Sequence, residues 1–137
     1  MIRYLLDTNT CIYLIKKKPE HVIARLKKAI SSGVGISSIT LSELEYGVQK
    51  SSQIRQNAIN LLKFIVQFEI MPYDENAARH YGMIRADLEK QGKTIGNMDM
   101  LIGSHARALE VTLVTNNERE FTRIKGLALQ NWARSDS

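Results

Sequence analysis

The sequence has one cysteine, two prolines and no long apolar run. Its one cysteine, Cys11, excludes an intramolecular disulfide and is typical of a protein from a reducing compartment. Two prolines and eight glycines form no linker, and no repeat or low-complexity tract is present, which favours one domain over residues 1–137. The first apolar run, residues 2–6, is too short for a signal peptide or a membrane span. We therefore expect a cytoplasmic protein with no membrane contact.

What is present is an ordinary globular composition with a basic balance. Hydrophobic residues make up 44% and charged residues 24% of the chain, which is enough to bury a core without a disulfide or a metal. Nineteen Lys and Arg against 14 Asp and Glu give a net charge of +5. This balance favours a polyanionic partner such as nucleic acid only when it is combined with a suitable site.

Short apolar runs alternate with stretches of helical periodicity. The runs at residues 2–6, 33–37, 69–71 and 111–114 are typical of short buried strands, and a last apolar segment covers 127–129. Helical patterns begin near residues 10, 19, 38, 54, 75 and 98, with a short helical turn at 118–123. This alternation predicts an α/β fold, a three-layer sandwich in which helices flank a central, mostly parallel sheet.

Two details of the helices follow from the same patterns. Ser38 or Thr40 is expected to cap the third helix, because a side-chain hydroxyl accepts a hydrogen bond from a free backbone N–H at that place. The helix that begins near residue 54 is expected to turn one apolar face to the core. That face comprises Ile54, Ala58, Leu61, Leu62, Ile65 and Phe68.

Three acids stand near the starts of helices that follow strands or loops. Asp7 comes directly after the first strand, Glu43 lies one turn into the helix after the second, and Asp99 begins a helix. Because open α/β folds place their sites at the carboxyl edge of the sheet, these acids could converge there. Each also has a structural alternative: Asp7 as a helix cap, Glu43 as a solvated position beside Glu45, and Asp99 as a favourable charge at a helix N-terminus.

Converging carboxylates repel one another and need a cation at neutral pH. Oxygen ligands favour Mg²⁺ or Mn²⁺ over Zn²⁺, for which one Cys and three scattered His supply no ligand set. Such a site can hold a phosphate oxygen, activate water and orient an in-line displacement at phosphorus. The basic surface could hold a nucleic-acid backbone around it.

At these residues the sequence resembles PIN-domain proteins, and more narrowly the VapC toxins of bacterial VapBC toxin–antitoxin systems. The resemblance runs from the first residues to Trp132 in family order and spacing. Its motifs are MIRYLLDTNTC with Asp7, ISSITLSELEYG with Glu43, IGNMDMLIGSHA with Asp99, and LVTNNEREF at residues 113–121.

The resemblance implies a type II toxin that is a Mg²⁺- or Mn²⁺-dependent endoribonuclease with Asp7, Glu43 and Asp99 as catalytic and metal-binding residues. A VapB-type antitoxin would block the site, and operator DNA would be bound through that antitoxin. The apolar helices near residues 22–30 and 54–68 would form a homodimer face or hold an antitoxin tail. The enterobacterial VapC subgroup, which this chain most resembles, implies cleavage of initiator tRNA in the anticodon stem-loop.

One position departs from the family pattern. Many PIN domains have a fourth acid where this chain has Asn117. Glu118 and Glu120 lie close by, and Glu120 is the better candidate for the fourth metal ligand, so we expect one metal ion rather than two. Asn9 and Thr115, with Asn117, resemble the polar residues that brace the acids, although a cap and a turn residue are the alternatives for Asn9 and Thr115.

Two rival functions remain open at this point. An RNA-binding module with a degenerate site is favoured only by Asn117. A phosphatase of the haloacid-dehalogenase type would use Asp7 as a nucleophile, but that class needs an Asp where Asn9 stands. Elsewhere, His105 is expected to be structural and Cys11 a core residue. Tyr46, Tyr73 and Tyr81 have either packing or base stacking as their role.

Overall fold

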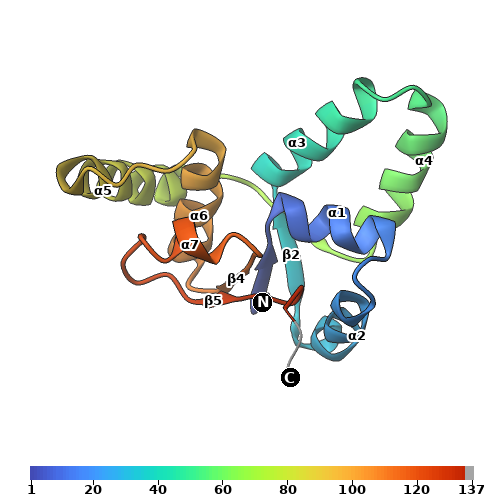
Figure 1. Ribbon diagram of the computed structural model, residues 1–137, viewed down its shortest axis with the longest axis horizontal. Helices are drawn as coiled ribbons and strands as arrows, with labels where there is room; N and C mark the ends of the chain where they lie inside the picture. The colour runs from blue at the N-terminus through green and yellow to red at the C-terminus, as the bar shows by residue number, and fades with distance from the viewer. Residues whose placement is uncertain (135–137) are drawn as a thin grey trace.

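The computed structural model describes residues 1–134, and Figure 1 shows its arrangement. The strands are β1 (Tyr4–Leu6), β2 (Val34–Ser37), β3 (Glu69–Met71), β4 (Thr112–Val114) and β5 (Leu129–Gln130). The helices are α1 (Thr8–Lys16), α2 (Glu20–Ala29), α3 (Ser38–Gln49), α4 (Ile54–Ile65), α5 (Glu75–Gln91), α6 (Asn97–Leu109) and α7 (Glu118–Phe121), with a 3₁₀ turn at Ile30–Ser32.

The strands form one sheet in the order β3-β2-β1-β4-β5, and every neighbouring pair is parallel. The central strand β1 pairs Leu6 with Ile36 on one side and with Val114 on the other. The predicted parallel sheet is therefore confirmed, with no antiparallel strand among residues 1–134. The last apolar segment also joins the sheet, since β5 pairs Leu113 with Leu129.

The two faces of the sheet carry separate cores. Successive side chains of a strand point to opposite faces, so the fully buried Leu5 and Leu6 of β1 belong to different clusters. Leu6 packs with residues of α1, α2, α3 and α4, whereas Leu5 packs with residues of α5, α6 and α7. In Figure 1 the two groups of helices lie on opposite sides of the strands. This is the three-layer sandwich that the sequence predicted.

The third helix is capped one residue earlier than expected. Ser37, the last residue of β2, has an extended backbone, and its hydroxyl accepts a hydrogen bond from the backbone N–H of Ile39 at 3.0 Å. The proposed caps Ser38 and Thr40 are wrong, because both already lie inside α3. The strand passes directly into the helix at the carboxyl edge of the sheet.

The buried face of α4 differs from the predicted one. Leu61 and Phe64 are buried within the helix, and Phe68 is buried just beyond it, in the cluster that contains Leu6. Leu62 is 60% exposed and Ile54 is 43% exposed, so their assignment to the core was wrong. The face is rotated toward Phe64, whose ring packs edge-on against Phe68 with centroids 4.9 Å apart.

None of the helices within residues 1–134 combines the length and the apolar character needed to cross a membrane.

Candidate active site

Asp7 is held where β1 becomes α1. It is 4% exposed, and its backbone N–H bonds to the carbonyl of Val114 at 3.0 Å. Its carboxylate accepts hydrogen bonds from the backbone N–H of Thr10 at 2.8 Å and from the hydroxyl of Thr115 at 2.5 Å. Burial raises the pKa of Asp7, and the hydrogen bonds from Thr115 and Thr10 oppose that rise. Asp7 is thus both the N-cap of α1 and a buried carboxylate at the edge of the sheet.

Glu43 approaches from the neighbouring helix. It lies on α3 and accepts a hydrogen bond from the hydroxyl of Thr8 in the first turn of α1, at 2.5 Å. Its charge adds to the upward shift of the Asp7 pKa. Thr8 and Thr10 were not predicted as site residues, although hydroxyl side chains one and three positions after Asp7, at the start of a helix, could have indicated them.

Asp99 and Glu120 meet through Asn117. The side-chain amide of Asn117 donates to Asp99 at 3.3 Å and to Glu120 at 3.2 Å. Desolvation raises the pKa of Asp99 to about 6, and the charges of Glu120, Asp7 and Glu43 contribute in that order. Four carboxylates from α1, α3, α6 and α7 therefore act on one another in one region of the molecule.

Of the two acids in the last motif, Glu120 shares a partner with Asp99, and its role as a metal ligand stays a prediction. Glu118 points elsewhere, because its carboxylate accepts hydrogen bonds from Asn131 at 3.0 Å and Arg134 at 3.2 Å. Asn117 stands at the position of the fourth acid discussed above, and its side chain is an amide instead of a carboxylate.

The braces differ in outcome. Thr115 makes the expected hydrogen bond to Asp7, and its hydroxyl also accepts the backbone N–H of Asn117 at 2.9 Å. Asn9 is exposed, and within residues 1–134 its side chain makes no hydrogen bond to any of the acids. Thr8 and Thr10 hold the positions near the carboxylates that we assigned to Asn9.

The donor set fits a hard divalent cation in charge and in kind. Within residues 1–134, Asp7, Glu43, Asp99 and Glu120 form no ion pair with a Lys, Arg or His. Among the same residues no group of three His, Cys, Asp or Glu side chains is arranged to hold a metal ion as it stands. Glu43 is hydrogen-bonded to Thr8, whereas Asp99 and Glu120 are both hydrogen-bonded to Asn117. A cation would have to gather these side chains.

Two other candidates from the sequence are structural. His105 is buried, bonds to the hydroxyl of Ser37 through Nδ1 at 2.8 Å, and stacks edge-on with Tyr73. Burial lowers the pKa of His105, against the opposing effects of Asp74 and the carbonyl of Pro72. Cys11 is fully buried, and burial, with the charge of Asp7 second, raises the pKa of its thiol well above the usual value. A buried neutral thiol is not a nucleophile.

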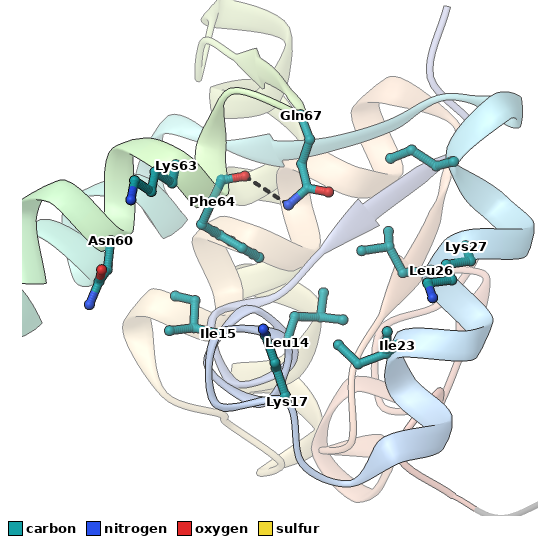
Figure 2. A pocket seen from close by; sticks show the side chains of 11 residues that line it. Leu14, Ile15, Lys17, Ile23, Leu26, Lys27, Asn60, Lys63, Phe64 and Gln67 are labelled. Atoms are coloured by element: carbon teal, nitrogen blue, oxygen red, sulfur yellow. Dashed lines mark hydrogen bonds between the residues drawn. The ribbon is translucent and has the colours of Figure 1, made fainter.

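A largely apolar groove runs along α1 and reaches Glu43. Its larger part, about 570 Å³, lies between α1, α2 and α4 and is bordered by Lys17, Lys27 and Lys63 (Figure 2). Its smaller part, about 270 Å³, lies between α1, α3 and α4 and has Glu43 in its lining. The two parts share Ile15 and therefore adjoin.

Known proteins with similar sequences and structures point the same way. The family profile described as PIN domain matches residues 4–127. A tRNA(fMet)-specific endonuclease VapC of Salmonella typhimurium is 45% identical over 132 residues, which are 96% of this chain and 99% of that protein. A ribonuclease VapC2 of Rickettsia felis is 46% identical over 130 residues, 94% and 97% of the two chains.

The structural comparison gives the same relatives. The crystal structure of VapBC2 from Rickettsia felis, bound to a DNA fragment from its promoter, matches with a TM-score of 0.91 at 45% identity, over 96% of this chain and 99% of that chain. The structure of DNA-bound VapBC from Salmonella typhimurium matches with the same score, identity and coverage. The chain belongs to the PIN-domain family and, within it, to the VapC ribonucleases.

Proposed function

We propose that this VapC ribonuclease cuts RNA at the site formed by Asp7, Glu43 and Asp99, with a Mg²⁺ or Mn²⁺ ion held between them. The observation that carries the proposal is the meeting of these carboxylates, with Glu120, at the carboxyl edge of the sheet with no cationic side chain of residues 1–134 paired to them. Uncompensated carboxylates repel, and a divalent ion removes that repulsion.

Dependence on a divalent metal is general among VapC nucleases with a PIN domain, and the choice of Mg²⁺ or Mn²⁺ is our inference from the oxygen ligands. Asp7, Glu43 and Asp99 would hold the ion, and Glu120 is the additional ligand. Held there, a divalent ion would supply positive charge near the scissile phosphate and acidify a bound water. With Asn117 in place of an acid, we assign one ion to the site.

The surrounding residues have positioning roles in this proposal. The hydroxyls of Thr115 and Thr8 fix the carboxylates of Asp7 and Glu43. Asn117 separates Asp99 from Glu120 with its amide, which lessens their repulsion. For Asn9 we propose a supporting role only through its place in the first turn of α1, since within residues 1–134 its side chain makes no hydrogen bond to the acids.

The RNA substrate is inferred from a relative. The Salmonella typhimurium protein is named for tRNA(fMet), and the alignment with it covers 96% of this chain. We therefore assign tRNA as the substrate here, with initiator tRNA and its anticodon stem-loop as the first target to test. A net charge of +5 suits a polyanionic substrate of this kind.

The partners follow from the assemblies of the related structures. Those structures are VapBC complexes, two of them with DNA. We assign a VapB-type antitoxin to this chain, with its tail in the lysine-bordered groove of Figure 2, and operator DNA bound through that antitoxin. We further assign a homodimer, a single domain over residues 1–137, and a cytoplasmic location.

The testing experiment is incubation of purified, antitoxin-free protein with total tRNA, in Mg²⁺ or in EDTA. Glu43→Gln removes a proposed ligand, and Glu45→Gln removes an exposed carboxylate two residues away as the matched control. We expect discrete fragments from the wild type and from Glu45→Gln in Mg²⁺ only, and none from Glu43→Gln. Equal cleavage by Glu43→Gln, or cleavage in EDTA, would contradict the proposed site.

The ends of the fragments distinguish the proposed reaction from a route through the ribose 2′-hydroxyl. Attack by water activated at the acids leaves a 5′-phosphate and a 3′-hydroxyl, whereas attack by the 2′-hydroxyl leaves a cyclic phosphate. Binding of tRNA without any cleavage would favour the RNA-binding alternative instead.

A further inference from the structure

Tyr46 is an exposed aromatic residue on the helix that carries Glu43. It is 65% exposed, whereas tyrosine is on average intermediate between buried and exposed. Within residues 1–134 its hydroxyl makes no hydrogen bond, and its ring belongs to neither core cluster. The amine of Lys50 lies over this ring, 5.1 Å from the centroid. The pair is accordingly an aromatic surface with a cation beside it, and it is not part of the packing of the fold.

The periodicity of α3 places this pair on the side of the active site. Residues seven apart lie on almost the same face of a helix, two turns along. Tyr46 is seven residues after Ile39, which packs into the cluster that contains α6. Lys50 is seven residues after Glu43, whose carboxylate meets Thr8 beside Asp7. Tyr46 and Lys50 therefore continue, away from the sheet, the face of α3 that borders the acids.

The distances along the helix suit neighbouring nucleotides of one substrate. With a rise of about 1.5 Å per residue, Tyr46 lies about 4.5 Å and Lys50 about 10.5 Å further along the axis than Glu43. In Figure 1 α3 runs from the edge of the sheet away from α5, and the side chains of Tyr46 and Lys50 near its outer end are exposed. A strand of RNA whose phosphate lies at the acids can pass along this face.

We infer that Tyr46 and Lys50 form a nucleotide subsite in which Tyr46 stacks on an unpaired base next to the scissile phosphate and Lys50 binds an adjacent phosphate. The inference rests on the proposed ribonuclease function and adds the substrate feature that the site selects, an unpaired base. Stacking needs a free aromatic face and is possible only for a base that is not stacked in a duplex. A cation beside the ring compensates the phosphate that accompanies the base, in a region made negative by Asp7, Glu43 and Asp99.

The first test is steady-state cleavage of a single-stranded RNA that contains the cut site found in tRNA. Loss of one base–aromatic stack weakens binding by about tenfold or more. We expect Tyr46→Ala to raise KM by about tenfold with little change in kcat, and Tyr46→Phe, which keeps the ring, to resemble the wild type. Val66→Ala removes a similarly exposed apolar side chain on the far end of α4 and is the matched control. A KM for Tyr46→Ala equal to that of Val66→Ala would overturn the subsite.

The second test removes the base instead of the ring. Binding of a fluorescently labelled RNA with the sequence of the initiator tRNA anticodon loop is measured in EDTA, with an abasic nucleotide at each loop position in turn. If Tyr46 stacks on one base, the wild type loses about tenfold in affinity at that one abasic position, and Tyr46→Ala loses nothing more there. If the abasic substitution and Tyr46→Ala weakened binding by independent factors at every position, the proposed contact would be overturned. Because no turnover is needed, this test decides the subsite even if the wild type proves unable to cut RNA, which would refute only the proposed function.

Salt dependence and oligomeric state complete the design. Lys50→Ala should reduce the slope of log affinity against log salt by about 0.7, the value for one phosphate contact on a single strand, whereas Lys28→Ala on α2 should not. Sedimentation of Tyr46→Ala checks the rival occupant of this surface, a second copy of the chain. A loss of RNA affinity that accompanies dissociation, and that higher protein concentration restores, would assign Tyr46 to a subunit interface instead.

Discussion

The Asp7 side chain is both the cap of α1 and a negative charge of the site. Substitutions can separate these two roles. Its carboxylate caps α1 by accepting the Thr10 N–H, and an Asn side chain can do the same with its amide oxygen. We expect Asp7→Asn to fold with nearly wild-type stability and to cut no RNA, because only the charge is lost. Asp7→Ala should in addition lose about 1 kcal/mol of unfolding free energy with the cap.

Thermal melting and RNA cleavage of the two variants check this prediction together. Wild-type cleavage by Asp7→Asn would remove Asp7 from the chemistry and leave it as a cap. A large loss of stability in Asp7→Asn would instead show that the buried charge is needed for folding.

Asp99 gives the site a dependence of stability on pH. Its pKa of about 6 in the folded protein lies above the usual 3.8, so the folded protein holds a proton that the unfolded chain releases. The free energy of unfolding should therefore fall as pH rises from about 4 to 6, in the absence of metal. Asp99→Asn removes this cost. Allowing for screening by solvent, we expect it to raise the unfolding free energy by about 1–2 kcal/mol at pH 7.5 and by little at pH 4.

Denaturant unfolding in EDTA at the two pH values measures the effect, with Glu45→Gln as the control for the loss of one negative charge. A gain that is the same at both pH values would point to a cause other than ionisation of Asp99. Saturating Mg²⁺ should reverse the order of stability, because only the wild type keeps all the proposed ligands.

At the scale of elements, two glycines test how closely the strands and helices approach. A Cβ at Gly35 in β2 would lie 2.8 Å from the backbone carbonyl of Glu69 in the adjacent strand, which cannot move without disturbing the sheet. Gly82 on α5 has no atom within 4 Å of the corresponding position. We expect Gly35→Ala to lower the unfolding free energy by about 2 kcal/mol or more, and Gly82→Ala to raise it by about 0.5–1 kcal/mol. Chemical denaturation of both variants is the measurement, and equal effects of the two would contradict the close approach of β2 to β3.

Patterns along the chain predicted the elements well because the strands are short and mostly apolar and are bounded by polar residues or proline. Glu69–Met71 was placed without error, and the helix expected to begin near residue 75 begins at Glu75. The face of α4 was predicted less well. The apolar residues of that helix form a broad stripe, and only the position of the sheet decides that Phe64 at one edge is buried and Leu62 exposed.

The acids of the site were identified from their places at the starts of helices, whereas their partners were not. The contact of Thr8 with Glu43 joins residues 35 apart, and that of Asn117 with Asp99 joins residues 18 apart. No periodicity within one element can indicate such pairs, because they depend on the order of strands in the sheet. The exposed position of Asn9 has the same origin, since α1 turns Thr8 and Thr10 toward neighbouring elements instead.

At the scale of the whole molecule, one sheet is shared by both cores, so we expect residues 1–137 to unfold in a single transition. Trp132, the one tryptophan, is buried in the cluster with Leu6 and packs edge-on against Tyr4 at 5.6 Å. Its fluorescence reports one face of the sheet, whereas far-UV circular dichroism reports helices of both faces. Coincident denaturation curves from the two signals would agree with one cooperative unit. Residual helical signal after the tryptophan transition would show that the α5–α6 side is a separate unit.

The buried cysteine makes the kinetics of opening directly measurable. Cys11 is the one thiol of the chain, it is shielded from solvent beside Asp7, and alkylating reagents react with thiolates that they can reach. The rate at which such a reagent labels the native protein therefore reports how often α1 and the edge of β1 separate, without any introduced probe. A ligand that gathers the acids should slow this labelling in proportion to its occupancy. Mass spectrometry of the labelled protein at increasing metal concentration would then measure metal affinity without any RNA.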